Sequence, residues 1–336
     1  MQEDLVKESK RLRAAWMKYD ADHLDRYLVS DLEDPRVNLQ SILIRSFLID
    51  AVFPHEFTTL IRQEFRFSIC MNFILRLLKN SPNQVSRVAI FDALENRRKK
   101  YGNFKIPAYM HDNFNLICNS QSDIPDYISL ALMDRLIDGD VYLPGSALSC
   151  FEQLWRDVLH GRSAERISVL EPACGSANDY RYLESYGMAR FLKYVGFDIC
   201  PKNIANARRR YPKVRFETGN ILDMPFDDNQ FGYLFLHDLL EHLSPAALEI
   251  ALAQLARVTR REACLNFFNM DVIDEHIIKP VKLYHWNTLS KNKICETLMR
   301  YAADIDIVPI DSFLRENYHC DDYYNQQAYT LIVSFE

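Results

Sequence analysis

The chain has 336 residues, of which 48% are hydrophobic and 26% are charged, and its formal net charge is −6. This length and apolar content can build a substantial core in one large or two ordinary domains. A negative net charge with scattered basic residues argues against a nucleic-acid partner, because a phosphate backbone requires a basic face.

The most apolar segments, 41–53 and 67–78, contain charged side chains and fall short of the roughly 18 residues that span a bilayer. The N-terminal residues lack the apolar stretch of a secretion signal. The eight cysteines form neither a CxxC pair nor a cluster with metal-ligand spacing. We therefore expect a cytoplasmic protein with reduced thiols, no membrane contact and no metal site.

Residues 1–162 show apolar side chains at three- and four-residue spacing, as at Leu43, Phe47 and Leu48, with prolines between the periodic stretches. This spacing predicts a mainly α-helical domain, because it places apolar side chains on one helix face. The segment contains no recognisable motif. Its apolar faces could cap a substrate, form a homodimer interface or bind another partner.

From Ile167 the pattern changes to short apolar runs separated by helical stretches. The runs are residues 167–170, 194–197, 214–216, 233–236, 264–268, 305–310 and 328–335. Strands that alternate with helices predict an α/β domain whose doubly wound, mostly parallel sheet is covered on both faces. We assign this domain to residues 163–336.

The stretch SVLEPACGSANDY contains the turn after the first of these runs, from Glu171 to Asn178. In doubly wound sheets, ligands bind beyond the carboxyl ends of the strands, where strand order reverses. Dinucleotide loops need glycines there so that the backbone can approach a pyrophosphate. Because Ala173 and Ala177 stand at two of the three glycine positions and only Gly175 remains, the loop favours a cofactor without phosphate at this point.

Two further segments can bind a nucleoside. Asp198 ends the second run, where a carboxylate can accept hydrogen bonds from both ribose hydroxyls. Ile199 can pack on an adenine face, and the Asn220 side chain with the Ile221 backbone can bind the adenine edge.

Taken together, these segments resemble the class I S-adenosylmethionine-dependent methyltransferases. EPACGSAND resembles the family's first motif, GFD at 196–198 its ribose motif, GNILDMPF its adenine segment and LLEHL at 239–243 the segment after the fourth strand. The departures are the two alanines, Asn220 where aspartate is common, and Gly232 where the family often has aspartate.

The resemblance covers about residues 164–336 and implies a Rossmann-like, seven-stranded sheet whose last strand is antiparallel. It also implies S-adenosyl-L-methionine as cofactor and S-adenosyl-L-homocysteine as product, with the methionine half near Glu171 and Gly175. The expected cofactor-binding residues are Glu171, Ala173, Gly175, Asp198, Ile199, Asn220, Ile221 and His237.

His237 is the candidate general base, because it follows the fourth strand where the sulfonium is expected and histidine titrates near neutral pH. On a regular helix it could instead bond Glu241, and Asp238 could bond His242, since both pairs are four residues apart. The two histidines lie five apart, a spacing that does not place them on one helix face for a metal.

The loops that follow strands five and six, residues 269–287 and 311–327, begin on the ligand-binding edge and are rich in aromatic residues. They suit a small-molecule acceptor with an apolar or aromatic portion. The expected substrate-binding residues are His242, Tyr284, His285, Trp286, Tyr318 and Tyr323.

These patterns favour a methyltransferase that acts on a small molecule, with oxygen as the preferred acceptor atom. Transfer to carbon or nitrogen is an alternative. A non-catalytic protein that keeps the fold for assembly is a second alternative, because two loop glycines are altered. A nicotinamide oxidoreductase is the weakest reading, since a pyrophosphate would meet Ala173 and Ala177.

Overall fold

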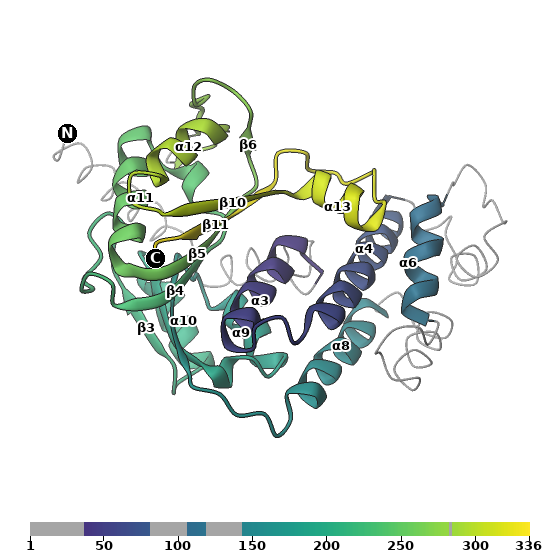
Figure 1. Ribbon diagram of the computed structural model, residues 1–336. Helices are drawn as coiled ribbons and strands as arrows, with labels where there is room; N and C mark the ends of the chain where they lie inside the picture. The colour runs from purple at the N-terminus through teal and green to yellow at the C-terminus, as the bar shows by residue number, and fades with distance from the viewer. Residues whose placement is uncertain (1–36, 81–105, 119–142, 282–283) are drawn as a thin grey trace.

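The computed structural model describes residues 37–80, 106–118, 143–281 and 284–336 (Figure 1). Its first half contains the helices α3 (Leu39–Val52), α4 (Thr58–Asn80), α6 (Ala108–Cys118) and α8 (Leu143–Leu159). No strand occurs among the described residues before Ile167. The prediction of helices in residues 1–36, 81–105 and 119–142 lies outside the described residues.

A seven-stranded sheet forms the centre of the second half (Figure 1). In order across the sheet, its strands are β10 (Asp304–Pro309), β11 (Tyr329–Ser334), β5 (Thr259–Phe267), β4 (Phe231–Leu236), β1 (Ile167–Pro172), β2 (Leu192–Asp198) and β3 (Arg215–Thr218). β11 is antiparallel to both neighbours, and the other pairs are parallel. Each strand overlaps a predicted apolar run, so the predicted Rossmann-like sheet with an antiparallel last strand is confirmed.

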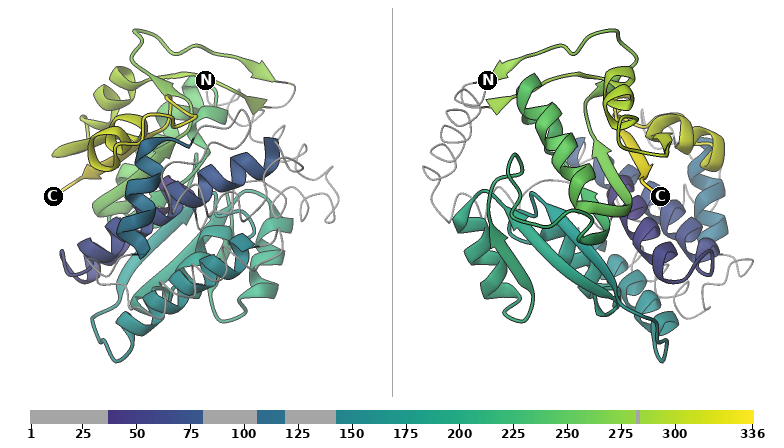
Figure 2. Two further views of the ribbon diagram at one scale, coloured as in Figure 1. Left: turned by 90° about the vertical axis from the view of Figure 1, so that its right-hand side faces the viewer. Right: turned by 60° about the vertical axis from the view of Figure 1, so that its left-hand side comes forward.

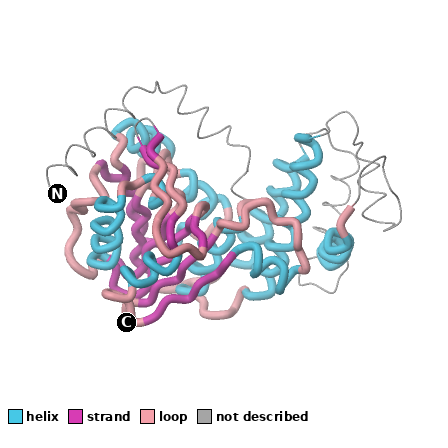
Figure 3. Tube along the Cα trace, turned by 90° about the horizontal axis from the view of Figure 1, so that it is seen from above, coloured by secondary structure: helices cyan, strands magenta, loops and turns pink. Residues whose placement is uncertain are grey.

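Helices cover both faces of the sheet (Figures 2 and 3). α11 (Pro245–Val258) and α12 (Lys291–Leu298) bury the face that includes Leu234 and Leu265. The opposite face, with Tyr233 and Phe235, is buried by α9 (Asn178–Ser185), α10 (Pro201–Arg210) and helices of the first half. Because strand side chains alternate between faces, burial on both faces explains why these strands are nearly continuous apolar runs.

α3 lies directly on the sheet. Its Phe47 ring meets Tyr233 edge to face, with ring centres 5.9 Å apart. Towards its N-terminus, the Gln40 side-chain amide donates to the carbonyl oxygens of Phe267 at 3.0 Å and Tyr329 at 2.9 Å. One hydrophobic core therefore runs from the first half into the sheet, and the domain boundary predicted from the sequence stays a prediction.

A buried ion pair joins α3 to α4 and α8. The side chains of Arg45 and Glu64 are 2% and 1% exposed, and Arg45 Nε donates to Glu64 Oε1 at 3.0 Å. Trp155 Nε1 donates to the other carboxylate oxygen at 2.9 Å. The Arg45 guanidinium also lies 4.7 Å from the ring centre of Tyr186, which follows α9. Because an unpaired buried charge is costly, this network fixes the first half against the second.

The segments that follow β5 and β10 differ from simple loops. After β5 come two short strand pairs, β6 (Met270–Asp271) with β9 (Leu289–Ser290) and β7 (Pro280–Val281) with β8 (Tyr284–His285). β8 contacts the 3₁₀ turn η2 (Leu240–His242), so this segment reaches the end of β4. After β10, the helix α13 (Ile310–Tyr318) occupies the first part of the predicted loop 311–327.

None of the described helices combines the length and apolar content needed to cross a membrane. Six cysteines whose side chains the structure describes are free thiols: Cys70, Cys174, Cys200, Cys264, Cys295 and Cys320. Burial raises the pKa of Cys174 well above its ordinary value, so this thiol in the loop after β1 stays protonated at neutral pH.

Candidate active site

The loop after β1 has a backbone conformation that favours glycine. Ala173, Gly175 and Ala177 have φ angles of 58°, 53° and 67°, in the left-handed region. A residue with a Cβ is strained there by roughly 1–2 kcal/mol. The two alanines therefore occupy glycine-type positions, as the sequence comparison with the family's first motif implied, and the loop keeps this shape at a cost in stability.

Gly175 connects this loop to the end of β2. Its N–H donates to Asp198 Oδ2 at 3.0 Å, and the N–H of Cys174 donates to the carbonyl oxygen of Phe197 at 3.1 Å. A Cβ placed on Gly175 would meet no atom within 4 Å. Open space therefore faces the backbone at the one position of the loop that is still glycine.

Asp198 lies at the carboxyl end of β2 and is 7% exposed. Besides the bond from Gly175, its Oδ1 accepts from the N–H of Cys200 at 2.7 Å and from Asn203 Nδ2 at 3.4 Å. Burial raises the pKa of Asp198 above its ordinary value, although these hydrogen bonds oppose the shift. The carboxylate thus orders the turn into α10 as well as the loop after β1.

A cluster of acidic side chains surrounds the end of β1. Glu171 is 3% exposed, and its Oε2 accepts a short hydrogen bond from the Tyr194 hydroxyl. Burial raises the pKa of Glu171 well above its ordinary value, and the carboxylates of Asp179 and Asp198 raise it further. Such a site favours a bound positive charge, because a cation would offset the mutual repulsion of these groups.

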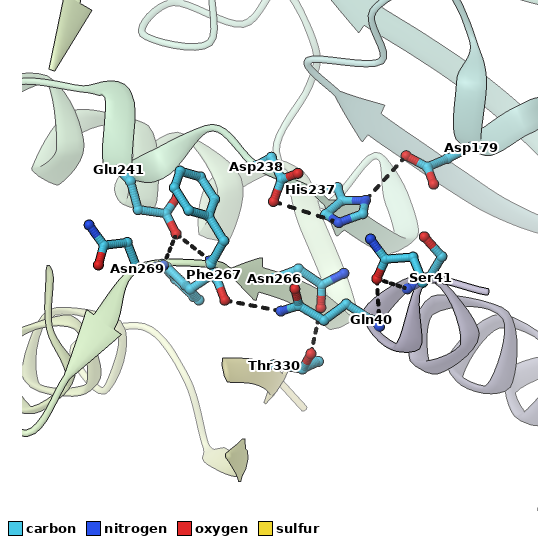
Figure 4. A network of polar contacts seen from close by, with 12 residues as sticks. Gln40, Ser41, Asp179, His237, Asp238, Glu241, Asn266, Phe267, Asn269 and Thr330 are labelled. Carbon is cyan, nitrogen blue, oxygen red and sulfur yellow. Dashed lines mark hydrogen bonds and ion pairs between the residues drawn. The ribbon is translucent and has the colours of Figure 1, made fainter. Parts of the chain in front are cut away.

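His237 follows β4 and lies between two carboxylates (Figure 4). Its Nδ1 is 3.5 Å from Asp179 Oδ2, and its Nε2 is 3.6 Å from Asp238 Oδ1. Burial alone would lower the pKa of His237, but Asp238 and Asp179 outweigh it and raise the pKa to about 10. At neutral pH the ring therefore carries a proton on both nitrogens and acts as a hydrogen-bond donor.

The chain after His237 does not form the regular helix on which two predicted side-chain pairs depended. Asp238 has a φ of 52°, and only the 3₁₀ turn η2 precedes α11. The pairs His237–Glu241 and Asp238–His242 are therefore wrong, because their partners are different groups. Bonds to residues distant in sequence determine this turn instead.

Glu241 holds η2 against the end of β5 (Figure 4). Its side chain is fully buried, and its Oε1 accepts from the N–H of Phe268 at 2.7 Å and from that of Asn269 at 3.2 Å. Burial raises the pKa of Glu241 to about 8, and Asp238 raises it as well. Glu241 is thus a positioning residue that joins the segments after β4 and β5.

His242 has the opposite electrostatic character to His237. Its Nδ1 lies 2.9 Å from the carbonyl oxygen of His285, so this nitrogen carries the proton and Nε2 keeps its lone pair. Its ring centre is 5.4 Å from each of the rings of Phe268, Tyr284 and Trp286. Burial lowers the pKa of His242, which keeps the imidazole neutral near pH 7.

Four of the six predicted substrate residues come together at this point: His242, Tyr284, His285 and Trp286. The other two contact different neighbours. Tyr318 is 6% exposed and packs on Phe65 of α4, with ring centres 5.4 Å apart. Tyr323 packs on Tyr324 at 5.0 Å. The segment after β5 thus forms an aromatic cluster around His242, whereas Tyr318 joins α13 to α4.

The predicted adenine residues lie on loops beside Asp198. Ile199 is half-buried directly after it. The Asn220 side chain accepts from the N–H of Leu222 at 3.1 Å, so it shapes the loop after β3. Ile221 is half-buried in the same loop. Among the residues that the structure describes, no three His, Cys, Asp or Glu side chains gather as a metal site.

Sequence reasoning missed three contributors to this edge of the sheet. Asp179 pairs with His237, and the Tyr194 hydroxyl donates to Glu171. From the first half, α3 places the Gln40 side chain on the last carbonyl of β5 and the first of β11. The Tyr194 contact joins the neighbouring strands β1 and β2, whereas the Asp179 contact joins α9 to the residue after β4. No signal in the sequence pointed to α3, because its partner groups are backbone carbonyls more than 200 residues away.

Replacing Ala173 by glycine should stabilise the protein. Glycine adopts a φ of 58° without a Cβ clash, so we expect Ala173→Gly to raise the free energy of unfolding by about 0.5–1 kcal/mol in denaturant titrations. Ala164→Gly is the control, because Ala164 precedes β1 with an ordinary φ. This variant should lower the free energy of unfolding by about 0.4–1 kcal/mol. An equal loss in both variants would contradict the strain assigned to the loop.

Residues 169–262 match the family described as "Methyltransferase domain". A probable S-adenosylmethionine-dependent methyltransferase of Mycolicibacterium smegmatis is 28% identical over 116 residues, which are 32% of this chain and 41% of that protein. A demethylmenaquinone methyltransferase of Beutenbergia cavernae is 31% identical over 113 residues, 32% of this chain and 44% of that protein. The chain thus spans less than half the length of these two relatives.

Among solved structures, the PH0226 protein of Pyrococcus horikoshii has a TM-score of 0.39 and 18% identity, over 58% of this chain and 92% of that one. The family match covers the loop after β1, the end of β2 and the segment after β4, where the sequence motifs lie. The C-terminal half of this chain therefore carries a methyltransferase domain, and the family match and the relatives support a class I S-adenosylmethionine-dependent methyltransferase there.

Proposed function

We propose that this chain is an S-adenosylmethionine-dependent methyltransferase that methylates a hydroxyl oxygen of a small molecule. The proposal rests mainly on one observation: the residues that match the methyltransferase-domain family include those at the carboxyl edge of the sheet. Residues 169–262 include the strained loop, Asp198 and both histidines. One relative is named as a probable S-adenosylmethionine-dependent enzyme, which supports the same cofactor here.

Asp198 would bind the ribose of the cofactor. A carboxylate offers about four lone-pair sites, and the bonds from Gly175, Cys200 and Asn203 use three of them. The remaining site can accept a ribose hydroxyl. The open space at Gly175 would admit the methionine half, and Ile199 would pack on the adenine.

The charge of the loop favours a cationic cofactor over a pyrophosphate. Glu171 and Asp179 stand at the end of β1 and the start of α9, close enough for Asp179 to raise the pKa of Glu171. A sulfonium or ammonium group would be attracted to this pair, whereas a doubly charged pyrophosphate would be repelled. The Ala173 methyl group adds a steric obstacle for a pyrophosphate.

Methyl transfer requires the acceptor hydroxyl to lose its proton. We assign His242 as the general base that accepts it. When bound, the cofactor's sulfonium supplies the methyl group, and the carbon–sulfur bond breaks towards sulfur as the acceptor oxygen bonds the carbon. His242 Nε2 has the lone pair that can accept the hydroxyl proton. His237, the base suggested by the sequence, does not suit that role with a pKa of about 10.

The remaining groups would hold the reactants in line. The rings of Tyr284 and Trp286 are 39% and 43% exposed, and together with Phe268 they form an aromatic surface around His242. Such a surface binds the apolar part of a small acceptor. Positioning of nucleophile and methyl group contributes much of the rate of an in-line displacement.

Asp198→Ala should weaken the binding of S-adenosylhomocysteine by about 1–3 kcal/mol, the cost of removing a buried hydrogen-bond partner. Calorimetric titration measures this loss, and unfolding curves verify that the variant is folded. Asp227→Ala removes an exposed carboxylate and serves as the charge control. The proposal fails when the wild-type protein shows no affinity for S-adenosylhomocysteine at millimolar concentration.

The two histidines should titrate in opposite directions from the ordinary value of about 6.5. In an NMR pH titration, with signals assigned through His237→Gln and His242→Gln, we expect a pKa below 6.5 for His242 and near 10 for His237. A His237 ring that loses its proton below pH 7 would return the role of base to that residue.

A further inference from the structure

Three buried polar atoms have no hydrogen-bond partner where α3 meets the sheet. They are Ser41 Oγ, Asn266 Nδ2 and His237 Nε2. Ser41 is 2% exposed and Asn266 is 0% exposed, and the His237 side chain is 12% exposed. Leaving a buried polar group unbonded costs roughly 1–3 kcal/mol, so three in one place require an explanation.

The strand register places Asn266 beside His237. In the parallel pair β4–β5, Leu236 is opposite Leu265, so the next residue of each strand is adjacent to its counterpart. Both side chains continue the face that carries Phe235 and Cys264. The two polar groups therefore lie next to each other at the end of the face that α3 covers.

α3 brings Ser41 to the same place. Its neighbour Gln40 donates to the carbonyl oxygen of Phe267, the residue after Asn266. One turn further along α3, Arg45 lies close enough to Asp179 for the two charges to interact, and Asp179 is the partner of His237. Figure 4 shows His237 and Asn266 near each other at the strand ends, with Ser41 on the neighbouring helix.

All three groups can donate hydrogen bonds. The Asn266 carbonyl oxygen already accepts from the Thr330 hydroxyl at 2.6 Å, which leaves the amide N–H groups. His237 Nε2 carries a proton while Asp179 contacts the other ring nitrogen at 3.5 Å. The Ser41 hydroxyl can turn its hydrogen to either side. Ser41 Oγ and Asn266 Nδ2 have no acceptor, and His237 Nε2 faces only the Asp238 carboxylate at 3.6 Å, so the group suits a ligand oxygen that only accepts.

The protonated His237 ring and the nearby Arg45 offset part of the negative charge around the three donors. Asp179 and Asp238 flank His237, and Glu171 is nearby. Asp238 is 52% exposed and stands 3.6 Å from Nε2, so it can move away towards solvent when a ligand takes that donor. Arg45 and the N-terminal end of α3 add positive potential on the other side.

We propose that Ser41, Asn266 and His237 form a subsite for a carboxylate group of the methyl acceptor. The inference rests on the proposed function and narrows it, because the acceptor would then be a carboxylic acid that also has a hydroxyl group. It gives α3 a direct role in substrate binding through Ser41. The first half of the chain is then part of the acceptor site.

The smallest carboxylate, formate, tests the subsite directly. Sodium formate is titrated into the full chain, with sodium chloride at equal ionic strength as reference, and binding is followed by the line width of ¹³C-formate. The titration is done with and without S-adenosylhomocysteine. We expect saturable millimolar binding that persists when S-adenosylhomocysteine is bound.

Three variants identify the groups involved. Ser41→Ala should weaken formate binding about fivefold or more, because one donor is lost. Asn266→Asp, of equal size, should abolish binding by placing a carboxylate against the ligand. Ser68→Ala is the matched control, since Ser68 is a fully buried serine of α4 whose hydroxyl also lacks a partner, and its formate affinity should equal that of the wild type.

Stability without ligand separates a binding role from a structural one. Ser41→Ala should raise or leave unchanged the unfolding midpoint, because it removes an unbonded buried hydroxyl. A marked loss of stability, or formate affinity equal to the wild type, would overturn the proposal. So would absence of saturable binding in the wild type.

Displacement of formate by S-adenosylhomocysteine would overturn the proposal in another way, because the subsite would then hold the cofactor's own carboxylate. Failure to bind S-adenosylhomocysteine would count against the proposed function alone. In that case the titration of the cofactor-free protein still decides whether the three donors bind a carboxylate.

Discussion

The reversal of strand order between β1 and β4 determines where the polar groups at the strand ends lie. β2 and β3 add to one side of β1, and β4 and β5 add to the other, so the loops after these strands diverge and leave a crevice at their carboxyl ends. Glu171, Asp198 and His237 each follow or end one of these strands. Burial at this edge raises the pKa values of Glu171 and Asp198, whereas the carboxylates of Asp238 and Asp179 raise that of His237 against the effect of burial.

The same edge also anchors the first half of the chain. Gln40 bonds the last carbonyl of β5 and the first of β11, and Arg45 joins the buried pair with Glu64. α3 is therefore held where a substrate of the methyltransferase domain would bind. This arrangement favours substrate capping among the three roles considered for the helical half, and Ser41 is the residue through which it would act.

Much of this architecture could be predicted from the sequence, because strands buried on both faces appear as short apolar runs and a glycine-type loop leaves a local pattern. The φ angles of Ala173 and Ala177 agree with the positions assigned to them. The turn at 240–242 could not be predicted, since Glu241 bonds backbone groups 27 and 28 residues away. Nor could the roles of the two histidines, because their opposite pKa shifts depend on neighbours contributed by other elements.

Hydrogen exchange measured by mass spectrometry, with and without saturating S-adenosylhomocysteine, tests most directly whether this edge binds the cofactor. The account predicts slower exchange in residues 171–177, 198–203 and 219–223, where the loops after β1, β2 and β3 would contact it. Residues 151–159 of α8, which lie outside the crevice, serve as the internal reference and should be unchanged. Unaltered exchange in all three loops, or protection confined to other segments, would contradict the account.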